Sequence, residues 1–244
     1  MAVRDRLPRD RYSWAAPIYD LATLAWSGGA IWRTRARALE FAKPGRTLLV
    51  PGAGTGRLAL EAAKRGARTV ALDRSPAMHA RAERRIERYL ESAAAQQRGG
   101  PSGIDLDLRL ASLDSLVPDA SFDVVVAEHF LNVFSPEDMP PIRERLIELT
   151  RAGGTLVIAD FAPENRRGSR LGRASQRLHH LIPLGGCALL TGNAMHPIYD
   201  HGADLARRKD LSQLGCEDER SFHVGPRWFR TWTFRKLGQD HEPR

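Results

Sequence analysis

The chain has 244 residues, of which 42% are hydrophobic and 27% charged. This composition excludes collagen-like and disordered chains and is typical of a globular protein with a sizeable core. Cys187 and Cys216 lie far apart and outside any CxxC pair, so neither a disulfide framework nor a thiolate metal site is predicted. Apolar runs end well before the roughly 18 residues of a membrane span, and no export signal is found, so we expect a cytoplasmic protein.

The net charge of +8 leaves two interpretations open. It suits a partner such as nucleic acid, an anionic membrane surface or an acidic substrate. It equally fits an arginine-rich composition without functional meaning.

After residue 45, apolar runs of strand length alternate with helical patterns, which favours a parallel sheet with crossover helices. Ser75 followed by Pro76 is typical of a helix N-terminus. The expected strands cover 47–50, 69–73, 104–110, 122–127 and 155–159, and the expected helices cover 57–65, 76 to about 93, and 135 to about 150.

The tail differs, because residues 216–224 and 227–235 flank a Gly225/Pro226 turn and predict an antiparallel pair. We therefore expect an α/β, Rossmann-like fold with a mostly parallel seven-stranded sheet, an antiparallel C-terminal hairpin and helices on both faces. The chain is predicted to be a single domain, residues 1–244, made of a helical arm (1–44), a ligand-binding core (45–162), an insertion over the substrate (163–213) and the hairpin (214–235).

The stretch Gly52-Ala53-Gly54-Thr55-Gly56 follows the first predicted strand and precedes a helix. Glycines there let the backbone approach a ligand, and the helix adds unpaired N–H groups and a positive dipole end. The third glycine comes one residue too early for the GxGxxG dinucleotide fingerprint, and the Lys-Ser/Thr of a P-loop is missing. Asp73, at the end of the second strand, is placed to accept ribose hydroxyls, so we predict a nucleoside ligand.

Four ordered segments, LLVPGAGTG, VALDRSPAM, VPDASFDVVVAEHFLNVF and LTRAGGTLVIADF, resemble motifs I, post-I, II and III of the class I methyltransferases that use S-adenosylmethionine. The arm, YDLATLAWSGGAIWRTRARALEFAKPG, resembles that of the ubiquinone/menaquinone C-methyltransferases and their relatives that methylate phospholipid head groups. The resemblance implies a methyltransferase (EC 2.1.1.-) with S-adenosylmethionine as its cofactor.

The resemblance also implies the residues of the cofactor site. Gly52, Ala53, Gly54 and Gly56 would form the loop along the cofactor, and Asp73 would hold the ribose. The adenine would be bordered by Arg74, Met78, and Ser112 or its neighbour Leu113, although Met78 equally suits the core of its helix. Many members carry an acid two positions before the first glycine, whereas this chain has Val50, a difference expected to weaken the cofactor's binding.

Methyl transfer from a sulfonium depends mainly on orientation, and a base is useful when the acceptor must lose a proton. Ligands of open α/β sheets react beyond the carboxyl ends of the strands, which nominates Glu128, His129, Asn132 and Asp160. Glu128 would receive the cofactor's amino group, while His129, Asp160 and the insertion's His196 are the candidate catalytic residues. The histidine pairs 179/180 and 196/201 lack metal-site spacing, so no metal is predicted.

We expect the acceptor to be a small molecule or lipid-like, with a quinone precursor or lipid head group favoured. Rival interpretations are a nucleic-acid methyltransferase, which the charge alone supports, a non-catalytic binding protein of the same fold, and a nicotinamide-dependent oxidoreductase. No stacking platform or RNA-binding module is recognisable, so nucleic acid is not expected as a partner.

Arginines in the insertion repeat at helical spacing, at 166, 170, 173 and 177, beside an apolar face of Leu171, Ala174, Leu178 and Ile182. Such a helix suits peripheral contact with an anionic membrane. The alternative is a solvated basic face over an ordinary core contact.

Overall fold

The structure is a computed structural model that describes residues 19–95, 103–117, 120–163, 169–191, 196–206, 214–225 and 227–237. Its centre is a seven-stranded sheet in the order β3-β2-β1-β4-β5-β7-β6, parallel from β3 to β5 and antiparallel at β7 and β6. The predicted sheet and its C-terminal hairpin are confirmed. The strands are β1 (Thr47–Pro51), β2 (Arg68–Asp73), β3 (Leu106–Leu110), β4 (Phe122–Glu128), β5 (Thr150–Phe161), β6 (Leu214–Val224) and β7 (Arg227–Lys236).

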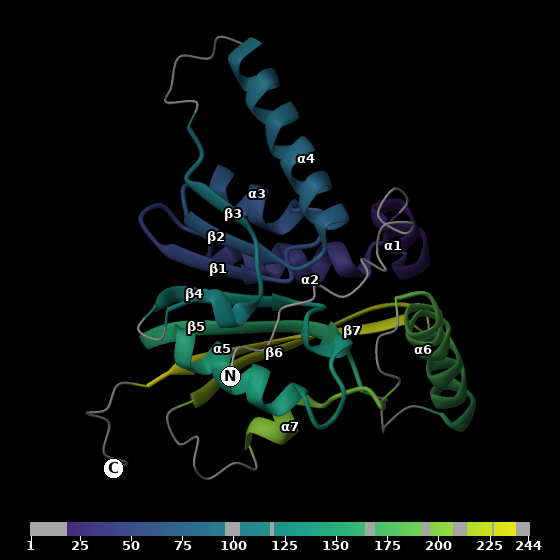
Figure 1. Ribbon diagram of the computed structural model, residues 1–244. Helices are drawn as coiled ribbons and strands as arrows, with labels where there is room; N and C mark the ends of the chain where they lie inside the picture. Colours follow the sequence, from purple (N-terminus) through teal and green to yellow (C-terminus); the bar gives the residue numbers. More distant parts are fainter. Residues whose placement is uncertain are drawn as a thin grey trace, which may run out of the picture.

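The sheet carries helices on both faces (Figure 1). They are α1 (Tyr19–Ser27), α2 (Ala30–Ala38), α3 (Arg57–Lys64), α4 (Pro76–Ala95), α5 (Met139–Leu149), α6 (Arg170–Thr191) and α7 (His201–Ala206), with short 3-10 turns η1 (Leu39–Phe41), η2 (Leu113–Ser115) and η3 (Leu131–Val133). Side chains alternate across the strands, so Leu48 and Val50 pack with α2 and α3, whereas Leu49 packs with α5 on the other face.

Two elements begin at different residues from those predicted. Helix α5 starts at Met139 rather than Ser135, because Ser135 Oγ instead accepts from Asp138 N at 3.2 Å in a turn. Strand β5 starts at Thr150 rather than at Thr155. Its first residues interrupt the regular register with β4, and Gly153 there has φ +70°.

Helices α1 and α6 stand at the same end of the sheet, on the right in Figure 1. Strand β5 leads toward α6, so this is the end where the parallel strands finish. None of the helices within the described residues is long and apolar enough to cross a bilayer.

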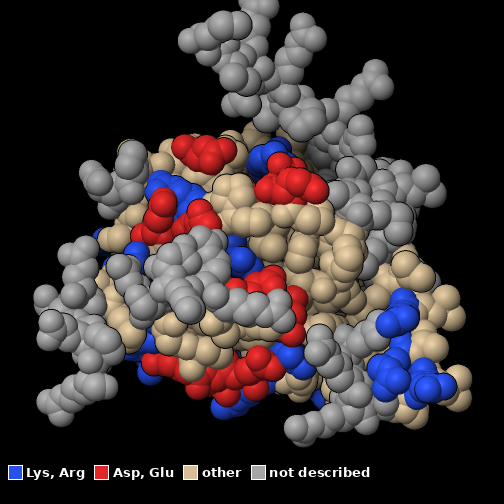
Figure 2. All heavy atoms as spheres, turned by 90° about the horizontal axis from the view of Figure 1, so that it is seen from below, with Lys and Arg blue, Asp and Glu red and all other residues tan. Residues whose placement is uncertain are grey.

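Figure 2 shows the face that lies below in Figure 1. Acidic and basic side chains are interspersed over most of what is described there, and a basic group stands at the right-hand edge, on the side of α6. The net charge of +8 therefore does not produce one continuous basic surface on this face.

Candidate functional site

The three glycines after β1 all have positive φ, at +62° for Gly52, +55° for Gly54 and +72° for Gly56. A Cβ on Gly52 would lie 2.5 Å from the Phe130 ring, and a Cβ on Gly56 would lie 2.7 Å from Cβ of Ala82 in α4. A Cβ on Gly54 would meet nothing within 4 Å. The outer glycines are thus required by packing, whereas Gly54 presents bare backbone to open space.

Asp73, the last residue of β2, holds this loop in place. Its Oδ2 accepts from Gly54 N at 2.7 Å, and its Oδ1 accepts from Ser75 N at 2.8 Å. Ser75 Oγ in turn accepts from Met78 N at 3.1 Å, which confirms the predicted cap of α4. A carboxylate therefore lies directly beside the open backbone of Gly54.

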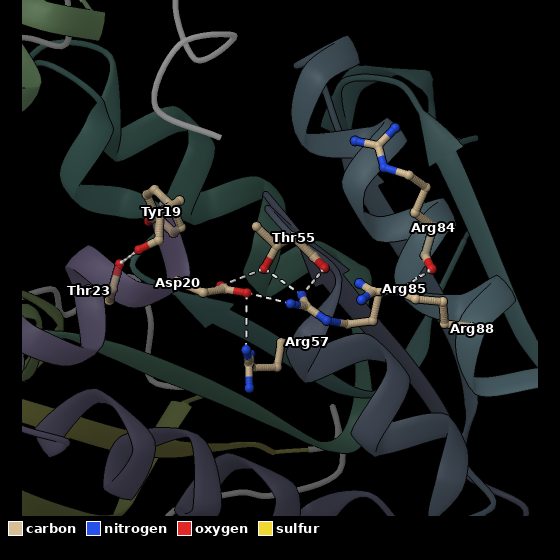
Figure 3. Close-up of polar contacts among 8 residues, drawn as sticks. All are labelled: Tyr19, Asp20, Thr23, Thr55, Arg57, Arg84, Arg85 and Arg88. Atoms are coloured by element: carbon tan, nitrogen blue, oxygen red, sulfur yellow. Dashed lines mark hydrogen bonds and ion pairs between the residues drawn. The ribbon is translucent and has the colours of Figure 1, made fainter. Parts of the chain in front are cut away.

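The arm contacts the glycine loop through Asp20 of α1 (Figure 3). Asp20 accepts from Thr55 Oγ1 at 2.8 Å, from Arg57 Nη2 at 3.1 Å and from Arg85 of α4. Burial alone would raise the pKa of Asp20, but the bonds from Thr55, Arg85 and Arg57 outweigh it and lower that pKa. One carboxylate thus joins the arm, the loop and α4.

Helix α2 brings a second arm residue to the end of β4. Arg35 Nε donates to both carboxylate oxygens of Glu128, at 3.0 and 3.1 Å, and the two side chains are 15% and 10% exposed. The guanidinium also lies 5.2 Å from the ring centroid of Trp32, which carries Arg57 at 4.7 Å. Glu128 is therefore a paired carboxylate at the edge of the glycine loop.

Asp160, near the end of β5, is 3% exposed and is surrounded by donors. Its Oδ1 accepts from Asn132 Nδ2 and from Phe161 N, both at 2.8 Å. His129 Nδ1 lies 3.6 Å from Oδ1, and His201 Nε2 lies 3.5 Å from Oδ2. Burial would raise the pKa of Asp160, but the two imidazoles outweigh it and hold that pKa far below its usual range. Asp160 is thus a fixed buried anion beside two imidazole rings.

His129 is the one non-glycine residue with positive φ within the described ranges, at +50°. Its N–H donates to Ala159 O at 2.7 Å, and its ring lies edge-on to Phe161 and Phe229, with centroids 5.4 and 5.6 Å away. Trp26 of the arm packs against the same two phenylalanines. Backbone strain is typical of functional sites and is maintained here by aromatic packing.

His196 lies beside this group but does not reach Asp160 through any contact that the described residues reveal. Its Nε2 is 2.8 Å from Asn132 O, and its ring stacks on Tyr199 at 4.4 Å. Tyr199 OH donates to Phe134 O at 3.0 Å, and burial raises the pKa of Tyr199 to about 12. Tyr199 therefore remains protonated at neutral pH and does not act as a base.

Comparison with known proteins identifies the fold and finds a family model that matches part of the chain. The family described as "Methyltransferase domain" matches residues 49–158. The demethylmenaquinone methyltransferases of two strains of Tropheryma whipplei are 29% identical over 163 residues, which cover 65% of this chain and 60% of each relative. The matched part is thus less than two thirds of those relatives.

Solved structures resemble the whole chain. The 1,6-didemethyltoxoflavin-N1-methyltransferase of Burkholderia thailandensis, with S-adenosylhomocysteine bound, has a TM-score of 0.59 and 16% identity, covering 98% of this chain and 92% of its own. The magnesium protoporphyrin IX methyltransferase of Synechocystis PCC 6803, with S-adenosylmethionine bound, has a TM-score of 0.54 and 15% identity, covering 97% and 86%. At these identities the likeness establishes the fold.

The chain has the fold of the class I methyltransferases, and its residues 49–158 match their methyltransferase domain. S-adenosylmethionine is the cofactor of this family, so the predicted cofactor is confirmed. Among the described residues, no group of three or more His, Cys, Asp or Glu side chains is arranged to hold a metal ion.

The remaining predicted residues of the cofactor site follow the strands β2 and β3 in sequence. Arg74 is exposed, Met78 is buried, and Ser112 follows Ala111, whose N–H donates to Asp73 O at 2.9 Å. Leu113 is 6% exposed and belongs to the core cluster that contains Leu131.

Sequence reasoning missed four residues that contact the site, namely Asp20, Arg35, Phe130 and His201. No local pattern marks them, because each meets its partner across at least 35 residues. Of these four residues, only His201 has a place in the sequence analysis, as half of the pair 196/201 that lacks metal-site spacing.

Proposed function

We propose that this chain transfers a methyl group from S-adenosylmethionine, held at the open backbone of Gly54, to a small-molecule acceptor. The observation that carries the proposal is Gly54 itself, whose left-handed backbone faces open space beside the carboxylate of Asp73. When bound, the cofactor supplies an electrophilic methyl group on a sulfonium.

The residues around the glycine loop would each bind a different part of the cofactor. Asp73 would accept hydrogen bonds from the ribose hydroxyls. Gly52, Ala53 and Gly54 would line the cofactor from the ribose toward its methionine end. Arg74, Met78, Ser112 and Leu113 would border the adenine, since all four lie near the carboxyl ends of β2 and β3. Such sites occur where parallel strands end in open α/β sheets.

His129 and Asp160 would lie at the methyl acceptor and assist its deprotonation. Asp160 stays ionised at neutral pH because its pKa is lowered, and its Oδ1 lies 3.6 Å from His129 Nδ1, where it can orient the ring. An acceptor O–H, N–H or acidic C–H could pass its proton to His129 as the new bond to the methyl group forms. His196 borders Asn132 on the other side and would line the acceptor space.

We infer a flat or lipid-like acceptor, with a quinone precursor or a lipid head group favoured. Phe161 and Phe229 pack beside His129, and Trp26, the partly exposed ring of this aromatic group, would meet the face of a planar acceptor. The relatives named as demethylmenaquinone methyltransferases support the same class of acceptor.

Ligand-induced thermal shifts test the cofactor. A ligand at about 100 times its Kd stabilises by roughly 2.7 kcal/mol, or about 5–10 °C for a domain of this size. We expect this shift with S-adenosylhomocysteine and none with NAD or NADP. Stabilisation by the nicotinamide nucleotides alone would reject the proposal.

A further inference from the structure

The two oxygens of the buried Asp160 carboxylate are held in different ways. Oδ1 accepts hydrogen bonds from Asn132 Nδ2 and from Phe161 N, and it lies 3.6 Å from His129 Nδ1. Oδ2 makes no hydrogen bond of normal geometry within the described residues, and His201 Nε2 lies 3.5 Å from it. His201 is therefore the side chain placed to hold the second oxygen.

Helix α7, which begins at His201, lies on the same side of the sheet as α5 (Figure 1). The other carboxylates near this helix already have basic partners. Asp204, one turn further along α7, pairs with Arg143 of α5 at 3.5 Å. Glu219 of β6 pairs with Arg230 of β7 at 2.8 Å. The carboxylate near the end of β5 is thus the one left for the imidazole of His201.

The burial of His201 argues against a role in packing alone. Its side chain is 0% exposed, and its ring lies edge-on to Trp232 of β7 with centroids 5.2 Å apart. A Cβ on Gly202 would lie 2.7 Å from Trp232 Nε1, so α7 packs closely on the strand. Neither ring nitrogen of His201 makes a hydrogen bond of normal geometry among the described residues. A phenylalanine would fill this space without burying polar atoms, so the imidazole indicates an electrostatic task toward Asp160.

We propose that His201 is a positioning residue for the methyl transfer, an inference that rests on the proposed function. With an N–H on Nε2, His201 would hold Oδ2 of Asp160 and thereby keep Oδ1 aimed at His129 Nδ1. A proton held on Nδ1 leaves Nε2 of His129 as the basic nitrogen. That Nε2 is buried and makes no hydrogen bond within the described part of the chain. The acceptor's proton would pass to it, while the acceptor's electron pair forms the bond to the methyl carbon and the C–S electrons stay on sulfur.

The tautomer of His129 tests this assignment without any knowledge of the acceptor. Nitrogen NMR of isotope-labelled histidines, recorded between about pH 6 and pH 9, shows which ring nitrogen carries the proton once the ring is neutral. We expect Nδ1–H in the parent, whereas histidine in water favours Nε2–H. His201→Phe, which keeps a ring and removes the donor, should move the proton to Nε2. His201→Gln, which restores an N–H donor, should keep it largely on Nδ1. His223→Phe, at an exposed ring stacked on Trp228 of the hairpin, is the matched control and should keep the parent's tautomer.

Several outcomes would overturn the inference. Nδ1–H retained in His201→Phe, or the same change in His201→Phe and His201→Gln, would reduce His201 to a packing residue. A parent His129 that keeps both ring protons throughout this pH range could not accept another. If His201→Phe does not fold, as its melting temperature reports, the parent decides, because a His201 Nε2 without a proton would reject the contact. Absence of stabilisation by S-adenosylhomocysteine would instead reject the proposed function, whatever the tautomer.

Discussion

Residues with positive φ gather where β1 and β4 end, and neighbouring glycines there have different tasks. Gly54→Ala places a methyl group in open space, so its cost to stability is the strain of φ +55°, about 1–2 kcal/mol. Gly56→Ala adds a clash with Ala82 at 2.7 Å and should cost more. We expect urea denaturation to rank Gly56→Ala as the less stable.

Binding should give a different order for the same two glycines. Gly54→Val, which fills the open space, should abolish binding of S-adenosylhomocysteine while the protein remains folded. Retained affinity in that variant would remove Gly54 from the proposed site.

Asp73 offers a second test of the cofactor site. Asp73→Ala removes a carboxylate predicted to bind the ribose and also the acceptor of Gly54 N. We expect a loss of about 1.5–3 kcal/mol in the binding of S-adenosylhomocysteine by calorimetry. Asp105→Ala, at an exposed surface pair with Arg68, is the control and should bind as the parent does. Equal affinity in all three proteins would contradict the assignment.

Asp160 gives stability a pH dependence of definite sign. Its pKa in the folded protein is lowered, so the stability it contributes is present above its unfolded pKa of about 4 and is lost as the pH falls from there through the lower folded pKa. Asp160→Asn should therefore be less stable than the parent at pH 7, by on the order of 2 kcal/mol, with the gap narrowing from about pH 5 to pH 2. A gap in urea midpoints that is the same at every pH would refute this.

The sequence allows candidate residues to be located where they follow a strand. Glu128, His129 and Asp160 stand directly at or after apolar runs, and the parallel sheet brings those ends together. Arg35 is missed because its position depends on how α2 packs on the sheet, 93 residues away in sequence from Glu128. The pattern of charges on a short helix does not indicate a partner so distant in sequence.

At the scale of elements, the arm is joined to the core through Asp20. Asp20→Ala leaves Arg57 and Arg85 without their shared carboxylate, so α1 should open more often. Hydrogen exchange of residues 19–27 should speed up, while β1 and β4 keep the parent's protection. Glu61→Gln, in an exposed pair with Lys64, is the control, since such pairs contribute little. Unchanged exchange in α1 would mean that other contacts hold the arm.

Strands and helices were predicted from periodicity, and most bounds agree within two residues. The start of β5 was not predicted correctly, because the pairing of β5 with β4 is irregular around Gly153 and Gly154. A Cβ on Gly154 would lie 3.0 Å from Asp123 O, so the glycine there allows β4 to approach closely. Without the partner strand in view, the two glycines suggested only the end of a loop.

At the scale of the whole molecule, α6 and α1 present exposed leucines that bear on contact with a membrane surface. Leu171, Leu178 and Leu181 of α6 are 81%, 61% and 53% exposed, beside Arg170 and Arg173. Leu21 of α1, at the same end of the sheet, is 70% exposed. Arg166 falls outside the described residues, and nothing is described of the Ile182 side chain.

Co-sedimentation with vesicles decides between an interfacial helix and a solvated one. An interfacial α6 should bind anionic but not zwitterionic vesicles, at about 1 kcal/mol per arginine, and release them in high salt. Replacing Arg166, Arg170, Arg173 and Arg177 by glutamine should abolish sedimentation. Identical behaviour of variant and parent would leave α6 as a cover over the acceptor.

The position of β7 has a consequence for how the chain reaches its final state. β7 follows every other strand in sequence, yet it lies between β5 and β6 and buries Trp232, Phe229 and Phe234 completely or nearly so. Until it is in place, β5 keeps an unpaired edge, and the helices packed on it lack part of their core. Because β6 pairs only with β7 among the described strands, and the two are neighbours in sequence, the hairpin joins the sheet as one unit along the edge of β5. A chain cut before β6 would therefore expose the edge of β5 to pairing with another molecule.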